Sequence, residues 1–120
     1  FNHWLSVDPV TGDVTTAYYN AIGFVTDFFL SRSTDGSATW LPDVQVTTQS
    51  SNEHDCSGLF PCPSINYGNQ YGDYEGLVSF GGVSHPIWTD SRRNTERAGD
   101  PTCGRGNGLM EEVFTATVTN

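Results

Sequence analysis

The sequence predicts an all-β protein of antiparallel strands joined by turns. Helix-forming residues are scarce in its 120 residues, whereas Thr, Val, Tyr, Phe, Gly, Asn and Ser are abundant. No window shows a sustained apolar period of about 3.6 residues. With 36% apolar and 12% aromatic residues, the chain has enough apolar surface for a modest core and fits one ordinary domain.

Two imperfect repeats of roughly 70 residues set the order of the strands. The first repeat predicts strands at 4–8, 14–20, 26–33 and 42–48. The second predicts strands at 76–81, 83–90 and 112–119, and it lacks a fourth. Three pairs of segments carry the parallel: Leu5-Ser6-Val7 with Leu77-Val78-Ser79-Phe80, Thr16-Ala17-Tyr18-Tyr19-Asn20 with Pro86-Ile87-Trp88-Thr89-Asp90, and Asp27-Phe28-Phe29-Leu30-Ser31-Arg32-Ser33 with Glu112-Val113-Phe114-Thr115-Ala116-Thr117-Val118.

One residue conflicts with this strand pattern. Pro86 falls inside the segment 83–90, where a proline cannot donate a backbone hydrogen bond to a neighbouring strand. The sequence therefore predicts a bulge or a strand start at Pro86.

A tight polar turn separates the third and fourth predicted strands: Ser33-Thr34-Asp35-Gly36-Ser37-Ala38-Thr39-Trp40. It resembles the Asp-box, or BNR repeat, of sialidases and related β-propellers, whose pattern is Ser-x-Asp-x-Gly-x-Thr-Trp. Only Ser37 departs from the pattern, since it replaces a glycine that often has positive φ; we expect either a less strained turn or some strain there. Ser33 and Asp35 are expected to accept backbone hydrogen bonds, and Trp40 to wedge its ring between neighbouring strands.

Three further segments extend the resemblance to bacterial BNR-type, exo-sialidase-like propellers: Trp4-Leu5-Ser6-Val7-Asp8-Pro9, Tyr71-Gly72-Asp73-Tyr74-Glu75-Gly76-Leu77 and Trp88-Thr89-Asp90-Ser91-Arg92. The resemblance implies four-stranded antiparallel meander blades, about two in this chain. The first blade is expected at 1–48, a long disulfide-prone loop at 49–75, and a second, incomplete blade at 76–120. A typical propeller closes with ~4–8 blades, so the remaining blades would come from a longer parent chain or from further copies.

The net charge of −9, with 14 acidic residues against five arginines and no lysine, argues against nucleic acid and anionic membrane surfaces as partners. No apolar run is long enough to span a bilayer. The acidic residues fit two roles, a solvated coat that keeps the protein soluble outside the cell, or ligands for calcium.

The chain has three cysteines, Cys56, Cys62 and Cys103, an odd number. A Cys56–Cys62 or a Cys62–Cys103 disulfide would staple loops, as in secreted proteins, and the sequence does not choose between them. Zinc is the weaker interpretation, since no Cys-x-x-Cys spacing accompanies them. We expect an extracellular, periplasmic or cell-surface protein, and, since the chain begins at Phe1, a processed or excised piece.

The candidate site lies where the long loops 49–75 and 91–111 are expected to meet, at the edge opposite the Asp-box turn. Asp73 and Glu75 would share one face of an extended segment, and Asp90 ends the neighbouring strand. The three carboxyl groups fit a glycosidase acid and its partner, a calcium site, or a structural role in which Asp90 pairs with Arg92 or Arg93 and Asp73 caps the bend at Gly72.

Aromatic and cationic residues near these carboxyl groups suggest a sugar-binding surface. Tyr71 and Tyr74 are candidates for stacking on a sugar ring, and Arg92 for a polar ligand contact. The arginine cluster and tyrosine nucleophile of sialidases cannot be assigned to residues of this chain, so catalytic residues stay unidentified. The leading hypothesis is an extracellular segment whose parent recognises or hydrolyses glycans; the alternative is a non-catalytic structural or adhesive module that assembles through blade edges.

Overall fold

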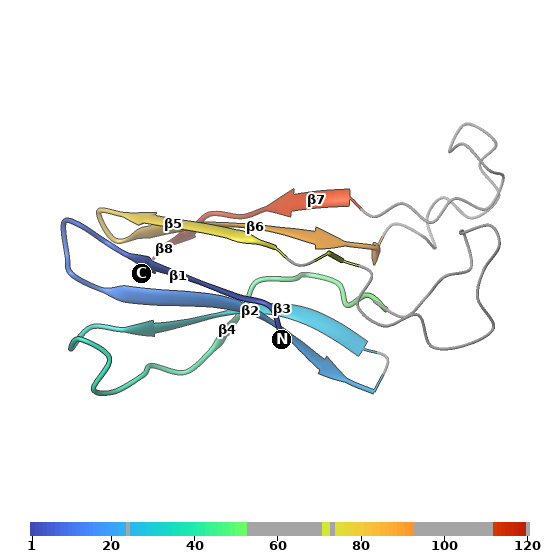
Figure 1. The fold of residues 1–120 in the computed structure, drawn as a ribbon, viewed down its shortest axis with the longest axis horizontal. Coiled ribbons are helices and arrows are strands. Elements are labelled where there is room, and N and C mark those ends of the chain that lie inside the picture. Colours follow the sequence, from blue (N-terminus) through green and yellow to red (C-terminus); the bar gives the residue numbers. More distant parts are fainter. Residues whose placement is uncertain (24, 53–70, 73, 93–111, 120) are drawn as a thin grey trace, which may run out of the picture.

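The described part of the chain forms two antiparallel β-sheets of four strands each (Figure 1). The computed structural model describes residues 1–23, 25–52, 71–72, 74–92 and 112–119, and this part of the chain contains no helix. The first sheet has the order β1-β2-β3-β4, with strands His3–Val7, Val14–Ile22, Val25–Ser33 and Val44–Gln45. The second contains β5 to β8, with strands Gly76–Phe80, Val83–Asp90, Glu112–Thr115 and Val118–Thr119. The all-β prediction is confirmed.

No membrane-crossing helix is found within these described ranges.

The predicted strands agree with the observed ones except on the outer side of each sheet. The last strand of the first sheet, predicted at 42–48, is limited to the two residues of β4. The strand predicted at 112–119 is divided into β7 and β8, which both pair with β6. The two short strands keep one register, since Ile87 lies opposite Thr115 and Ser84 opposite Val118. The four strands of the second sheet therefore occupy three positions.

Pro86 explains the division of this outer strand. It lies inside β6, so the prediction of a strand start is wrong, and the unbroken register shows that no bulge is inserted. The amide of Ala116 donates to the carbonyl of Pro86 at 3.4 Å, but Pro86 has no N–H to return the bond. The ladder is therefore interrupted at 116–117, between β7 and β8.

The core lies between the two sheets, which pack face to face (Figure 1). Alternate residues of β2, β3, β5 and β6 are buried, as expected for sheets with one buried face. The ring of Phe28 from the first sheet stacks on Trp88 from the second, with 5.1 Å between ring centroids and 10° between planes. The buried apolar residues are Ala17, Tyr19, Phe28, Leu30, Tyr71, Leu77 and Trp88.

The first strands of the two sheets are the closest neighbours across the core, and they run in the same direction (Figure 1). The amide of Ser79 on β5 donates to the hydroxyl of Ser6 on β1 at 3.0 Å. The sheets are therefore joined along β1 and β5, the strands that begin each repeat.

The Asp-box turn, residues 33–40, follows β3 and forms a compact hydrogen-bonded loop. The Ser33 hydroxyl accepts from the amide of Ser37 at 2.9 Å, and the carboxylate of Asp35 accepts from the amide and hydroxyl of Thr39 at 2.8 and 2.6 Å. These bonds lower the pKa of Asp35 to about 2, and the bond from the hydroxyl of Thr39 contributes most to this shift. Ser37 has a φ of 72°, so it carries the strain that glycine would avoid.

Trp40 differs from the expectation. Its ring was expected to lie between strands, but its exposed fraction is 44%, so this expectation is wrong. The turn is held by the polar bonds of Ser33 and Asp35 rather than by the packing of an indole.

Candidate functional site

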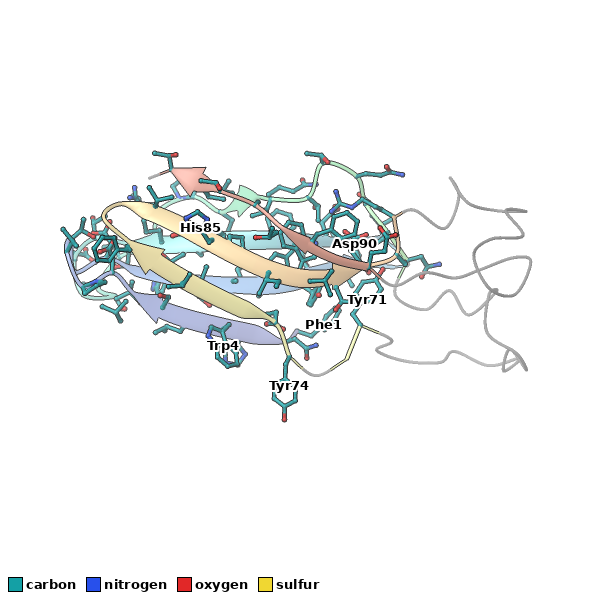
Figure 2. The ribbon with its side chains drawn as sticks, turned by 90° about the horizontal axis from the view of Figure 1, so that it is seen from above. Phe1, Trp4, Tyr71, Tyr74, His85 and Asp90 are labelled. Atoms are coloured by element: carbon teal, nitrogen blue, oxygen red, sulfur yellow. The ribbon has the colours of Figure 1, made fainter. Side chains whose placement is uncertain are left out.

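The predicted site residues that the structure describes lie at one end of the two sheets, which we call the loop end. Tyr71 and Asp90 lie at this end in Figure 2, while Tyr74 points away from both sheets. The tight turns after β1, β3 and β5 lie at the opposite end, the turn end (Figure 1). Asp73 and the three cysteines, Cys56, Cys62 and Cys103, lie outside the described residues.

Glu75 is a buried carboxyl group without a partner. It precedes β5, whose inward positions Leu77 and Ser79 continue the alternation, so its side chain points between the sheets. Its exposed fraction is 8%, and neither carboxyl oxygen has a hydrogen-bond partner. Burial raises the pKa of Glu75 to about 7, and the amino terminus and the residue's own amide offset only part of this effect. This carboxyl group therefore titrates near neutral pH.

Asp90 is also buried, but it is fully engaged. Its carboxylate accepts from the amide of Arg92 at 2.7 Å and from the guanidinium at 2.8 and 2.5 Å. The indole of Trp88 adds a weaker bond at 3.3 Å. Arg92 in turn lies 4.3 Å from the ring centroid of Phe114, a cation–π contact. The pairing of Asp90 with Arg92 is the one expected for the structural role; a contact of either residue with a ligand stays a prediction.

Two buried tyrosines complete the loop end. Tyr71 is 4% exposed, and its hydroxyl bonds the hydroxyls of Ser51 at 2.6 Å and Ser91 at 2.7 Å. Its ring centroid lies 5.6 Å from that of Tyr19, so the ring belongs to the core. Stacking of Tyr71 on a sugar stays a prediction that would require this ring to leave the core.

Tyr19 joins the two sheets and was not singled out by sequence reasoning. Its hydroxyl donates to the carbonyl of Thr89 at 2.8 Å and accepts from the amide of Thr89 at 2.9 Å. Burial raises its pKa, and the nearby charges of Glu75 and Asp90 add to this effect. A tyrosine on a strand with alternating apolar residues is interpreted as a core residue, so Tyr19 was missed. The signal that could have indicated its contact with Thr89 is that the two residues occupy the same position in the two repeats.

Tyr74 is the exposed aromatic residue of the predicted set. Its exposed fraction is 80%, and Figure 2 shows the ring extending away from the sheets at the loop end. It is therefore the one described member of the predicted sugar-binding pair that a ligand could reach without rearrangement.

The described residues contain no group of three or more His, Cys, Asp or Glu side chains placed to hold a metal ion. Calcium at Asp73, Glu75 and Asp90 therefore stays a prediction, because Asp73 lies outside the described ranges.

The turn end contains a residue that sequence reasoning missed, Asp8. Its side chain has an exposed fraction of 0%, and its carboxylate accepts from the amides of Gly82 at 2.7 Å and Gly81 at 3.1 Å in the second sheet. The amides of Val10 and Thr11 bond the same group at 2.8 and 3.3 Å. Burial opposes ionisation, but the four amides outweigh it and hold the pKa of Asp8 at about 2.

The turn at Gly81 and Gly82 is shaped to meet Asp8. Both glycines have positive φ, of 60° and 83°, as a two-residue hairpin loop of type I′ requires. Their amides thereby point at the carboxylate, and Asp8 links the two sheets across the turn end.

Chemically, the loop end combines one carboxyl group that ionises near neutral pH with one that is neutralised by an arginine. A glycosidase would need two carboxyl groups that both reach the substrate, whereas Glu75 and Asp90 are 8% and 1% exposed. Comparison of the chain with protein-family models, with curated proteins and with solved structures found no match.

Proposed function

We propose that this chain is a two-blade sector of an extracellular Asp-box β-propeller, and that its described residues serve as a structural scaffold. The observation that carries the proposal is the contact between Tyr19 and Thr89, which occupy the same position in the two repeats. Neighbouring sectors around a shared axis bring repeated positions next to each other in this way.

The direction of the strands supports the same proposal. A small rotation about an axis along the first strands keeps repeated strands parallel, whereas a two-fold axis across them would make β1 and β5 antiparallel. β1 and β5 run in the same direction and are the closest strands across the core (Figure 1). This is the relation expected of blades whose first strands line a common axis.

The scaffold role is favoured over catalysis because the two described candidate catalytic groups, Glu75 and Asp90, are enclosed or paired. The test is hydrolysis of a fluorogenic sialoside by the purified chain and by Asp90→Asn. We expect no hydrolysis by either protein and a lower melting temperature for the variant, because Arg92 loses its partner. Hydrolysis that disappears in Asp90→Asn while the circular dichroism spectrum is unchanged would overturn the scaffold proposal.

Glycan recognition by the parent propeller is the second candidate, and the exposure of Tyr74 favours it. An aromatic ring held clear of the sheets can stack on a sugar face. We expect signals on a glycan array to be lost in Tyr74→Ala and retained in Tyr74→Phe. Identical signals from both variants would remove Tyr74 from the proposal.

Calcium binding is tested independently of both candidates. If Asp73 joins Glu75 and Asp90 around an ion, millimolar Ca²⁺ should raise the melting temperature, and a chelator should reverse the rise. An unchanged melting curve would remove the ion from the proposal.

A further inference from the structure

The outward face of the second sheet is apolar and free of acidic residues. Inward positions of β5, β6 and β7 alternate with outward ones, which include Val78, Phe80, Ile87 and Val113, exposed at 58, 66, 46 and 69%. Figure 2 looks onto this face, with His85 on it. The outward strand residues are Gly76, Val78, Phe80, Val83, His85, Ile87, Thr89, Val113, Thr115 and Thr119.

None of these ten residues is Asp, Glu or Arg, although the whole chain has 14 acidic residues. Where one face of a sheet lies in water, the strands alternate apolar residues on the buried face with polar residues on the exposed face. A large apolar patch on such a face indicates that another surface covers it.

The repeat indicates which surface would cover the outward face of the second sheet. Ile87 occupies the repeat position of Ala17, and Val113 that of Phe28. In the first sheet these two positions are buried, since Ala17 and Phe28 are both 0% exposed and Phe28 stacks on Trp88. The outward face of the second sheet is thus the same face of the repeat, without its cover.

The chain carries a matching cover on its opposite side. On the second sheet, the face that covers Phe28 presents Trp88 stacked on Phe114, with ring centroids 6.1 Å apart and planes at 26°. The same positions of the first repeat are Tyr18 and Phe29, which stack at 6.1 Å and 18°. Tyr18 and Phe29 lie on the outward face of the first sheet, whereas Ala17 and Phe28 lie on its inward face.

A hollow marks where the cover would fit. A shallow pocket of about 260 Å³ is lined by Tyr74, Glu75, Gly76 and Trp88 and, on the outward face of the second sheet, by Ile87, Thr89 and Val113. The three lining residues on the outward face are the repeat counterparts of Ala17, Tyr19 and Phe28, the surface on which Trp88 packs. The ring of Tyr18 from a second copy would occupy the position of Trp88.

We propose that copies of this chain associate head to tail, with the outward face of the first sheet of one copy covering the outward face of the second sheet of the next. The contact continues the packing that already joins the two sheets within one chain. This inference rests on the proposed sector arrangement, and it requires that the remaining blades come from further copies of this chain. Such an interface is heterologous, so each copy uses two different faces and association closes only when the rotation permits a ring.

The experiment uses two variants with equal added charge, one for each face, and measures particle mass by native mass spectrometry and sedimentation. The first-face variant is Leu5→Glu with Val7→Glu, two outward residues of β1 that are each 55% exposed. The second-face variant is Ile87→Glu with Val113→Glu. Val10→Glu, in the exposed turn after β1, is the control for added charge.

We expect the unaltered chain and Val10→Glu to form particles larger than the 13.1 kDa chain. Each face variant alone should be monomeric, with a dissociation constant raised at least tenfold. Mixed in equal amounts, the two variants should form a one-to-one dimer and nothing larger, because each retains one intact face. Association should strengthen with salt, since the copies carry like charge.

Three results would overturn the inference: a monomeric unaltered chain at high concentration, self-association by either face variant, or a mixture that forms no dimer. Circular dichroism of each variant shows that it has folded. A folded, monomeric unaltered chain would leave the sector proposal intact, with further blades supplied by a longer parent chain. The scaffold role fails on the sialoside result above, whatever the particle mass, so the two failures are distinguishable.

Discussion

Two buried carboxyl groups, one at each end of the molecule, have opposite electrostatic environments. Asp8 at the turn end accepts four backbone hydrogen bonds and has a pKa of about 2. Glu75 at the loop end has no hydrogen-bond partner for either oxygen and has a pKa of about 7. Both are almost fully removed from solvent. Burial therefore does not decide the charge state; the amides that surround the group do.

The two ends of the molecule therefore differ in how their buried carboxyl groups respond to pH. The turn end joins the sheets through a charge that persists at every physiological pH. At the loop end, Asp90 forms an ion pair with Arg92, whereas Glu75 gains or loses a proton near neutral pH. The following substitutions test this division, beginning with the largest expected effect.

Removal of Asp90 should be the most damaging change at the loop end. Asp90→Ala leaves the guanidinium of Arg92 in a largely buried position without its carboxylate, a loss of about 3 kcal/mol. Urea unfolding at pH 7 measures it. The double variant Asp90→Ala with Arg92→Met is the control and should recover part of the loss; an undiminished stability of Asp90→Ala alone would show that the ion pair is not structural.

Removal of Asp8 should loosen the turn end. Asp8→Ala leaves the amides of Gly81 and Gly82 without an acceptor, and we expect the melting temperature to fall on the order of 10 °C. In the unaltered protein the folded pKa of Asp8 lies below its unfolded value of 3.8. Its contribution is therefore complete above about pH 4 and is lost as the pH falls toward about 2.

Thermal melts of both proteins between pH 2 and 7 measure this effect. Their melting temperatures should converge at the acid end of the series. A difference that stays constant down to pH 2 would contradict the assigned role of the Asp8 charge.

Glu75→Gln should stabilise the protein at neutral pH. The folded pKa of Glu75 is raised from 4.5 to about 7, so the folded state holds its proton over a range in which the unfolded state has released it. The stability of the unaltered protein therefore falls as the pH rises from about 4.5 to about 7, by about 1–2 kcal/mol once residual solvent screening is allowed for.

The variant should lack this contribution to the pH dependence. Urea unfolding at pH 4, 6 and 8 provides the measurement. At pH 4 the two proteins should be equally stable, which is an internal control. A variant that is less stable than the unaltered protein at pH 8 would mean that Glu75 has a partner in the folded state.

The smallest expected effect is at the Asp-box turn. Ser37→Gly replaces a residue with a φ of 72° by one that adopts this conformation freely, so relief of strain opposes the greater entropy of the unfolded chain. We expect a net gain of a few tenths of a kcal/mol up to about 1 kcal/mol, measured by urea unfolding. Gly36→Ala, at the preceding position with the same φ, is the matched control and should be destabilising.

Local patterns were sufficient to predict most of the fold. The two repeats placed β1, β2, β3, β5 and β6 within two residues of their observed bounds. The fourth strand was overestimated because β4 pairs with β3 over only two residues, which propensity does not reveal. The interruption at 116–117 depends on Pro86, about 30 residues away in the chain, and is visible only once the register is known.

The site was harder to predict because its properties depend on contacts between the sheets. Asp8 was expected only as the last residue of the strand at 4–8, and the glycine amides that bind it come from the other repeat. Glu75 was recognised as a candidate from its spacing, but the absence of a partner cannot be read from spacing. Trp40 matched a motif whose packing depends on neighbours, and here the indole lies at the surface.

Pro86 also affects how the protein meets other chains. Because the outermost strand of the second sheet is split into β7 and β8, that border offers only two short runs of backbone groups, separated where the ladder to β6 is interrupted. A discontinuous border of this kind is a poor template for lateral addition of a foreign strand, the route that leads to fibrillar aggregates. The missing N–H of Pro86 thus disfavours the addition of a strand at this border of the second sheet. The proposed association between copies uses the outward faces of the sheets instead.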